Sequence, residues 1–491
     1  MRYNRLHKDN NYLTPTTDTQ TLSEYAVGLK YEDIPPEVVE RAKMILLQTV
    51  GVSLAARNTD TAEKVLKMSR EANGGEGGPT TVWGTGGKMA AVNAALALGT
   101  LSDALDWEDC SWTGHPAAGV IPCAWLAAEE KHRSGKDLIA AIVAGYEVYQ
   151  RIAMAVQPSE ERRKNKGWGL TSWQIFGCII PIAKLYGLDA RKVNQAIGMG
   201  CECSTLPACH HSTTMSDFYH YEHGYRARDG FLIVKAVEKG IHNQRDALDE
   251  PRCYTGVICG NDGSNGSGET LIRSEEADLT WLTRDLGKRY LIMETLLKHW
   301  PANMWVQTSA ELVHDLSVKH GFGPEDVEEI LIDAPVLNRM WAPDEGFTSV
   351  THAQFSIPYV VAAMLYNPVP GADWYTAETM RDPKVIALSK RVKPGPSPET
   401  SPAAGFKMFR EETGYPMKTV TVTLKNGARY EGGMDCHPGH PRNMMSREEF
   451  VSRFRVQAAP VLEGERLEKA IRVLCGIESV EDIASLAGLL S

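Results

Sequence analysis

The chain has 491 residues, of which 43% are hydrophobic and 23% charged, and its formal net charge is −10. This length exceeds one ordinary hydrophobic core, so we expect two domains. The negative charge and the lack of a long basic stripe argue against nucleic-acid binding. No apolar run reaches the roughly 18 residues of a membrane span, and no secretory signal is evident, which predicts a cytoplasmic protein. Ten cysteines without a disulfide-scaffold spacing fit a reducing compartment.

Helical patterns dominate the first 280 residues. Apolar residues recur at three- and four-residue intervals in five segments, residues 35–56, 90–102, 119–130, 134–151 and 171–187. A glycine-rich stretch at residues 74–78 lacks the Lys-Ser/Thr ending of a phosphate loop, so we interpret it as a plain loop. The first half therefore predicts an all-helical domain.

The segment between the second and third of these helices, residues 103–122, carries an unusual density of carboxylates, hydroxyls and a histidine beside core-type sequence. Burial and neighbouring charges shift pKa values and prepare such groups for acid–base chemistry. The alternative is structural: Asp103 solvates a helix end, Asp109 or Ser111 caps a helix, and His115 is a satisfied core histidine.

This segment resembles the motif LDxDD…HP(S/A)xxxxP of the MmgE/PrpD family. That family includes 2-methylcitrate dehydratase, cis-aconitate decarboxylase and iminodisuccinate epimerase, which are cofactor-free enzymes of small polycarboxylates. Residues 134–151 resemble the family pattern SGKxLLxAxxxGYEVxxR, and residues 353–362 resemble A(K/Q)FSxPYxxA. The resemblance implies a soluble homodimer that acts on a small-molecule carboxylate without a cofactor.

A second chemical cluster follows at residues 201–223, with cysteines and histidines at short spacing. The spacing is neither a paired CxxC nor an HExxH pattern, so we predict no metal site. The glycines at 224 and 230 resemble the family's HxGxAAxxG helix start, which places Tyr219 where the family has a catalytic lysine and Glu222 where it has a histidine. Gly169 also stands where many members carry a catalytic histidine.

Candidate replacements for the missing lysine and histidine lie nearby. They follow Tyr219 on the same predicted helix and are His220, His223, Arg226 and Arg228. The basic run at residues 162–166 is either a solvated face or a region that attracts carboxylates.

Strand patterns appear in the second half. Residues 327–335 alternate like a strand, and residues 418–432 predict a hairpin with an Asn-Gly turn. Residues 392–416 have the composition of a surface linker. Ser446 and Glu449 form a predicted capping box ahead of a helix, and residues 460–490 are again helical.

These elements predict a mainly α fold of MmgE/PrpD type. We expect a large all-helical domain over residues 1–280, completed by residues 457–491, and a smaller α+β lid domain over residues 281–456. A cleft between the two domains is the expected place for a small-molecule substrate.

The resemblance also implies roles for individual residues. Asp106 and His115 are the expected acid–base pair, Asp103 supports them, and Tyr359 orients the substrate or donates a proton. The expected substrate-binding residues are Lys298, Arg226, Arg228, His223 and Cys110. Lys298 belongs to the family element KxxP…Q(T/S); its structural alternative is an exposed lysine at a helix end.

The predicted function is that of a metal-independent lyase, a dehydratase or decarboxylase, which removes a proton next to a carboxylate of a small polycarboxylate. Two alternatives stay open. The first is an epimerase or isomerase of a dicarboxylate such as iminodisuccinate, and the second is a non-catalytic binding protein.

Overall fold

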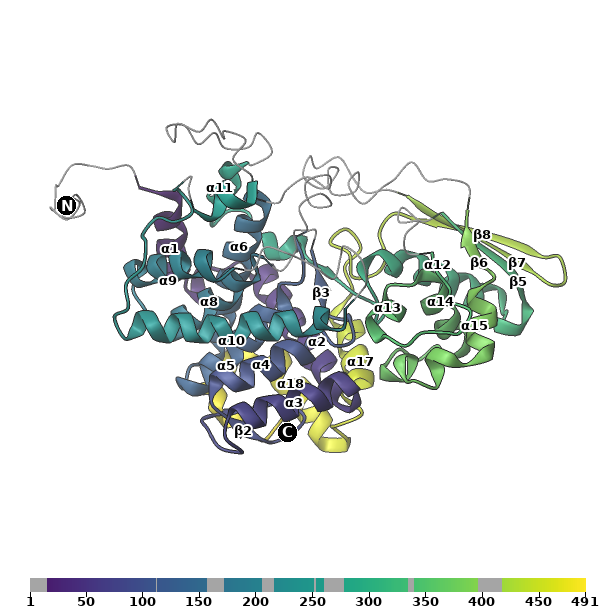
Figure 1. Cartoon of the computed structure of the whole chain (residues 1–491), viewed down its shortest axis with the longest axis horizontal. Coiled ribbons are helices and arrows are strands. Elements are labelled where there is room, and N and C mark those ends of the chain that lie inside the picture. The colour runs from purple at the N-terminus through teal and green to yellow at the C-terminus, as the bar shows by residue number, and fades with distance from the viewer. Residues whose placement is uncertain are drawn as a thin grey trace.

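A computed structural model describes residues 16–111, 113–156, 172–204, 216–250, 253–259, 278–333, 340–395 and 417–491. The chain is mainly α, as predicted, with a helical body beside a smaller part that contains both helices and a sheet (Figure 1). The body contains α1 (Asp18–Gly28), α2 (Pro36–Ala55), α3 (Asp60–Ala72), α4 (Ala91–Leu101), α5 (Ala117–Glu130), α6 (Gly135–Val156), α8 (Gln174–Leu185), α9 (Ala190–Cys203), α10 (Phe218–Glu238) and α11 (Tyr254–Cys259).

Local sequence explains where several of these helices begin. The Thr17 and Thr59 hydroxyls accept hydrogen bonds from backbone amides in the first turns of α1 and α3, and the Asp189 carboxylate does the same for α9. Such side chains satisfy amides that have no partner inside the helix. Pro36 starts α2, where its missing N–H costs nothing.

One helix among the described residues, α6, has the length and hydropathy of a membrane-crossing segment, although the sequence predicted none. Its apolar window is completely buried inside the protein. A core helix of a globular protein has the same composition, and burial explains why α6 is mostly apolar, with Glu147 and Arg151 paired to each other in its buried part.

Helices α4 and α10 cross in close contact at two glycines. A Cβ atom on Gly99 would lie 2.8 Å from the Gly224 Cα, and one on Gly224 would lie 2.3 Å from the Leu96 carbonyl oxygen. Both distances are too short for real atoms, so any larger residue would push the helices apart. This contact brings the start of α10 to the end of α4, where the carboxylate-rich segment begins.

The smaller part contains a four-stranded sheet of order β6-β5-β7-β8. Its strands are β5 (Val327–Ile332), β6 (Val392–Pro394), β7 (Lys418–Leu424) and β8 (Arg429–Met434), and its helices are α12 (Met304–His320), α13 (Val350–Gln354), α14 (Ile357–Tyr366) and α15 (Pro383–Ser389). Strands β5 and β6 are parallel and the other pairs are antiparallel. Helix α12 packs on β7 and β8, and α14 packs on β6.

The predicted hairpin at residues 418–432 is confirmed, with one difference at its turn. The last paired residues are Thr423 and Arg429, and the Leu424 amide donates to the Ala428 carbonyl at 2.8 Å. The connection is therefore longer than a two-residue Asn-Gly turn. Gly427 has a φ of 87°, a left-handed conformation that glycine adopts without strain.

The chain returns to the helical body through α17 (Arg447–Ala458) and α18 (Gly464–Cys475) (Figure 1). Both helices pack against α2. The predicted capping box is confirmed, because the Ser446 hydroxyl accepts from the Glu449 amide at 3.2 Å and the Glu449 carboxylate accepts from the Ser446 amide at 2.6 Å. The division at residue 280 and at residue 457 stays a prediction.

Candidate active site

The carboxylate-rich segment forms the turn between α4 and α5. Asp103, Asp106 and Glu108 are completely buried there. Asp106 has a φ of 49°, which is uncommon for a residue with a side chain, and its amide donates to the Asp103 carbonyl at 2.8 Å. Backbone strain of this kind persists where surrounding structure enforces it, and it often marks functional sites.

A short two-stranded ribbon brings Lys298 to this turn. Strand β3 (Asp109–Cys110) pairs antiparallel with β4 (Leu296–Leu297), and the Lys298 amide extends the ladder by donating to the Glu108 carbonyl at 3.2 Å. Residues opposite each other in such a ladder have neighbouring side chains. The buried Lys298 ammonium accordingly donates to Glu108 at 2.6 Å and also to Asp106, 192 positions away in the sequence.

His115 lies between two hydrogen-bonding partners. Its Nδ1 contacts the Glu108 carboxylate, and the Lys298 ammonium is 3.3 Å from the same nitrogen. Its Nε2 is 2.9 Å from the Tyr219 hydroxyl, which comes from the first turn of α10. Partners on both ring nitrogens fix the orientation of the imidazole and provide a path for a proton.

Two further histidines of α10 face Asp103. His220 Nδ1 is 2.7 Å from one carboxylate oxygen, and His223 Nε2 is 3.6 Å from the other. Residues 219, 220 and 223 lie on one side of the helix because three and four residues make about one turn. The contact between α4 and α10 is what brings this side to the carboxylates.

Burial and neighbouring charges shift the pKa values of the cluster residues in different directions. Burial and the negative charges of Glu108 and Asp106 hold the pKa of Asp103 well above its usual range. Burial also opposes ionisation of Glu108, but the attraction of Lys298 and the hydrogen bond from His115 outweigh it and hold the pKa of Glu108 well below its usual range. Burial lowers the pKa of His220 and His223. The cluster therefore contains a protonated carboxyl, an ionised carboxylate and neutral histidines within one buried site.

The next residue in the segment, Asp109, supports the turn from the opposite side of the ribbon. Its carboxylate accepts from the Ala117 amide at 2.9 Å, at the start of α5, and from the Tyr146 hydroxyl at 2.5 Å. Burial raises the pKa of Asp109 to about 7, against the lowering effect of these two hydrogen bonds.

The cluster also has the composition of a metal site. Ligand atoms of Asp103, Asp106, Glu108 and His115 lie within 4.8 Å of one another. The Lys298 ammonium already contacts three of these four side chains. A fixed positive charge in this position provides the neutralisation that a cation would otherwise supply.

Five of the nine predicted site residues meet in this cluster: Asp103, Asp106, His115, His223 and Lys298. Lys298 is completely buried, which excludes its structural alternative as an exposed lysine. Cys110 follows Glu108 by two residues and forms a wall of the adjacent pocket.

Three predicted site residues lie outside the cluster. Arg226 donates to the Cys203 carbonyl at 2.9 Å, at the end of α9, and Arg228 pairs with Asp229 at 2.7 Å. The Tyr359 hydroxyl donates to the Trp374 carbonyl within the smaller part. The two arginines lie about two turns or more along α10 from Tyr219, so their positions on the helix are beyond the carboxylates.

Two residues of the cluster were missed as site residues by sequence reasoning, Glu108 and Tyr219, while His220 was named only as a candidate replacement for the family lysine. Glu108 belongs to the carboxylate-rich segment at residues 103–122. Its role depends on its position opposite Lys298 in the β3–β4 ladder, which the sequence does not show. Tyr219 was noted only as a departure from a family lysine. The spacing of Tyr219, His220 and His223 on one helix face was the available signal.

Several predictions lie outside the described residues. These are Gly169, the basic run at residues 162–166, and the cysteine and histidines at positions 209–211. Cys201 and Cys203, at the other end of that second cluster, belong to the last turn of α9.

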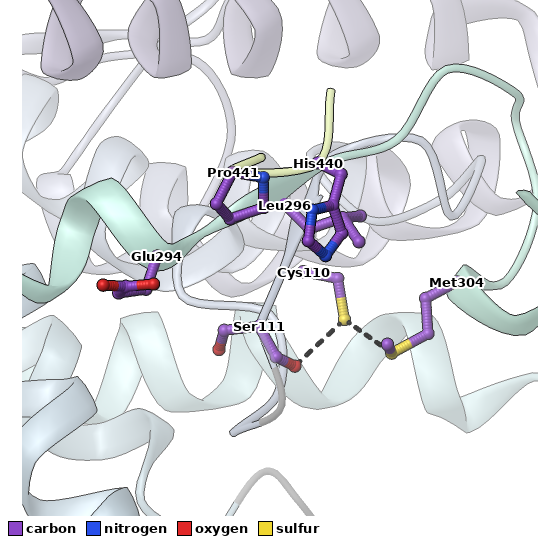
Figure 2. Close-up of a pocket in the computed structure, with 7 residues that line it drawn as sticks. All are labelled: Cys110, Ser111, Glu294, Leu296, Met304, His440 and Pro441. Carbon is purple, nitrogen blue, oxygen red and sulfur yellow. Dashed lines mark hydrogen bonds between the residues drawn. The ribbon is translucent and has the colours of Figure 1, made fainter. Parts of the chain in front are cut away.

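A small pocket lies beside the β3–β4 ribbon, with Cys110 and Leu296 in its lining. Figure 2 shows its lining: Cys110, Ser111, Glu294, Leu296, Met304, His440 and Pro441. The Cys110 sulfur lies 3.3 Å from both the Ser111 carbonyl oxygen and the Met304 sulfur, and its single S–H can donate to either. The pocket and the cluster thus share the β3–β4 ribbon as a common wall.

Comparisons with known proteins agree with the sequence motifs. Residues 20–265 match the model of the MmgE/PrpD N-terminal domain, and residues 300–475 match that of the MmgE/PrpD C-terminal domain. Cis-aconitate decarboxylase of Homo sapiens is 23% identical over 484 residues, which cover 96% of this chain and 94% of the relative. The Mus musculus enzyme of that name is 24% identical over 96% of this chain and 93% of the relative, and the Aspergillus terreus enzyme is 22% identical over 96% of both.

Proposed function

This chain belongs to the MmgE/PrpD family, and from that premise we propose that it is a lyase that removes carbon dioxide from a small polycarboxylate. The relatives named cis-aconitate decarboxylase extend over nearly the whole chain, which favours decarboxylation over the loss of water. The observation that carries the proposal is His115, held between Glu108 and Tyr219 next to the buried Lys298.

Decarboxylation breaks a carbon–carbon bond and leaves the electron pair on carbon. A neighbouring carbon–carbon double bond accepts this pair, and the reaction ends when a proton reaches the far carbon of the resulting allyl system. A histidine that is oriented on both nitrogens and paired with a carboxylate is suited to deliver that proton. We assign this role to His115, with Glu108 stabilising its protonated form.

Lys298 neutralises negative charge in the same site. Its ammonium contacts both Asp106 and Glu108, and exchange of one of these contacts for a substrate carboxylate would anchor the substrate beside His115. A preorganised cation in a site without water stabilises charge that develops in the transition state. Asp103 holds His220 and completes the support of α10.

We further propose that the reaction needs no metal ion, because Lys298 supplies a positive charge among the same side chains that would bind one. Activity should survive exhaustive dialysis against a chelator, measured as the initial rate of product formation. A rate that falls with dialysis and returns with a stoichiometric divalent cation would contradict this part of the proposal.

The reaction is tested by proton NMR in deuterium oxide, with chelator-treated protein and four acids: cis-aconitate, citrate, 2-methylcitrate and iminodisuccinate. We expect carbon dioxide release from an unsaturated tricarboxylate, with one deuterium incorporated into the product. Deuterium exchange without loss of carbon dioxide would support the epimerase alternative, and loss of water would support a dehydratase. Binding without any turnover would support the non-catalytic alternative.

A matched pair of histidine variants ties the reaction to the cluster. His115→Gln should lower kcat by about 100- to 10,000-fold, the usual contribution of an acid–base group, with a smaller effect on KM. His242→Gln, at an exposed position, should leave both constants unchanged. Equal activity of the two variants would overturn the role of His115.

A further inference from the structure

The pocket beside the active-site cluster faces a region of buried positive charge. His440 lines this pocket and is 4% exposed, and Figure 2 shows its ring next to Cys110. The Arg442 amide donates to His440 Nδ1 at 3.1 Å, which leaves the proton of the neutral ring on Nε2. His440 therefore acts as a hydrogen-bond donor through Nε2.

A lysine lies behind His440. Lys418 is 9% exposed, and its ammonium contacts the Thr308 hydroxyl at 3.3 Å and lies 6.0 Å from the Trp305 ring centre. No carboxylate lies within 4.0 Å of it among the residues that the structure describes. Burial lowers the pKa of Lys418 to about 8, and its charge contributes to lowering the pKa of His440 to about 4.

A second buried cation lies next to the pocket. Arg41 is 5% exposed and donates to the carbonyl of Thr295, which lies between the pocket residues Glu294 and Leu296. Its Nε is buried without a hydrogen-bond partner, and so is the Nε2 of His437, whose ring centre is 6.2 Å from that of His440. Asp109 is the carboxylate that acts on Arg41, but among the described residues no carboxylate lies within 4.0 Å of Arg41 or of Lys418. Buried cations without a direct ion pair are costly, so their presence points to a bound anion.

The ribbon connects this cationic region to the anionic cluster. Cys110 and Leu296 of the ribbon line the pocket, and the residues that flank these strands, Glu108 and Lys298, belong to the cluster. The pocket carboxylate, Glu294, is itself paired with Arg289 at 3.3 Å. A polycarboxylate that reaches across Cys110 would place one end at His115 and another at His440.

We propose that the pocket at His440 binds a carboxylate that the substrate keeps, with His440 as hydrogen-bond donor and with Lys418 and Arg41 supplying the positive potential. The proposal deepens the proposed function and rests on it. It makes His440 and Lys418 determinants of the number of carboxylates in the substrate.

The test measures binding by titration calorimetry, so it does not depend on turnover. The probes are propane-1,2,3-tricarboxylate, which has no double bond, and two acids that each lack one of its carboxylates, glutarate and 2-methylsuccinate. The wild-type protein should bind the triacid about 10- to 100-fold more tightly than the weaker of the two diacids, the usual effect of a charge-assisted hydrogen bond. In His440→Leu and in Lys418→Met this ratio should fall to within about threefold of unity.

Matched controls are Lys425→Met, at an exposed position just after β7, and His242→Gln, which should both keep the wild-type ratio. Melting temperatures establish that each variant is folded. With a turned-over substrate, the His440 and Lys418 variants should raise KM by the same factor and change kcat little.

The outcomes separate the two proposals. Turnover by the wild-type protein, together with unchanged triacid-to-diacid ratios in both variants, would overturn the pocket assignment and leave the proposed function intact. In another outcome, the wild-type protein prefers the triacid but turns over none of the acids, and both variants lose this preference. That result would support the pocket assignment and overturn the lyase proposal. Failure of the wild-type protein to bind any of the three probes would overturn both.

Discussion

At the scale of single residues, the site depends on one lysine among three carboxylates. The Lys298 ammonium contacts Asp106 and Glu108, and its attraction helps to hold the pKa of Glu108 well below its usual range, while burial and the charges of Glu108 and Asp106 raise the pKa of Asp103, which lacks such a contact. A buried charge is tolerated only where an opposite charge and hydrogen bonds compensate it. The protonation pattern that acid–base chemistry needs therefore follows from where one ammonium lies.

The first prediction concerns that ammonium. Lys298→Met leaves Asp106 and Glu108 buried without their cation, so the free energy of unfolding should fall by about 3–5 kcal/mol. The loss should be smaller at pH 5 than at pH 8, because proton uptake by the carboxylates relieves the repulsion. Denaturant unfolding at both pH values measures this, and kcat should fall roughly 100- to 1,000-fold.

Lys288→Met is the control for this change, because Lys288 is exposed in the segment that leads to β4. It should alter neither stability nor kcat. A Lys298→Met protein with wild-type stability at both pH values would contradict the account of the buried charges.

The second prediction concerns Asp109, whose pKa is raised to about 7 from an ordinary value near 4. The folded protein binds this proton more tightly than the unfolded chain does, so the contribution of Asp109 to stability is complete below about pH 4 and is lost as pH rises to about 7. Asp109→Asn removes this dependence and keeps the acceptor for the Ala117 amide. The stability of the variant relative to the wild type should rise by about 1.4 kcal/mol per pH unit across that window.

Unfolding in denaturant at pH 5, 6 and 7 provides the measurement. A difference between the two proteins that stays constant over these three values would show that Asp109 does not titrate in the window.

At the scale of elements, the site depends on the β3–β4 ribbon, which has only two residues in each strand. Gly439 supports the ribbon, because its carbonyl accepts from the Leu297 amide at 2.8 Å and its backbone has a φ of 96°. A Cβ atom on Gly439 would lie 2.0 Å from the Leu297 carbonyl oxygen. Any side chain at this position would therefore displace the residue directly before Lys298.

The third prediction follows from this contact. Gly439→Ala should lower kcat by roughly 100-fold, because a shift of about 1 Å in a catalytic group has an effect of that size. Gly427→Ala is the matched control: Gly427 also has a positive φ, but a Cβ atom there meets nothing within 4 Å. The control should lose about 1–2 kcal/mol of stability and keep its kcat. Equal kcat values for the two variants would show that the ribbon does not position Lys298.

At the scale of the whole molecule, the cluster and its pocket draw on distant parts of the chain. The turn after α4, the start of α10, the end of β4 and the segment before α17 all contribute side chains. Helix α17 packs on α2 and also carries Arg453, which donates to the Lys298 carbonyl. The return of the chain to the helical body thus supports the residue at the centre of the site.

The fourth prediction concerns assembly. We propose that the protein is a homodimer and that the outer side of α10 takes part, because Phe218, Tyr225 and Leu232 repeat there at seven-residue spacing and Phe218 and Leu232 are 49% and 51% exposed. Light scattering should give twice the mass of one chain. Leu232→Glu should shift the protein towards the monomer, whereas Val318→Glu, at a 69% exposed position on α12, should not. A wild-type monomer at all concentrations would contradict the proposal.

Elements whose signals are local can be predicted from the amino-acid sequence. The helices around residues 90–130, the 418–434 hairpin and the Ser446–Glu449 capping box depend on periodicity, turn residues and caps within a few positions. The same local reading, with the family motifs, singled out Asp103, Asp106, His115 and Lys298. These residues stand in short patterns that are readable without the fold.

Which of these residues meet depends instead on how distant segments of the chain pack together. Glu108 faces Lys298 because of a ladder register between strands about 190 positions apart, and Tyr219 reaches His115 because two glycines let α4 and α10 touch. The same helix carries Arg226 and Arg228 past the site. Contacts between distant segments depend on packing, which no local pattern specifies, and the physical chemistry of the site follows from those contacts.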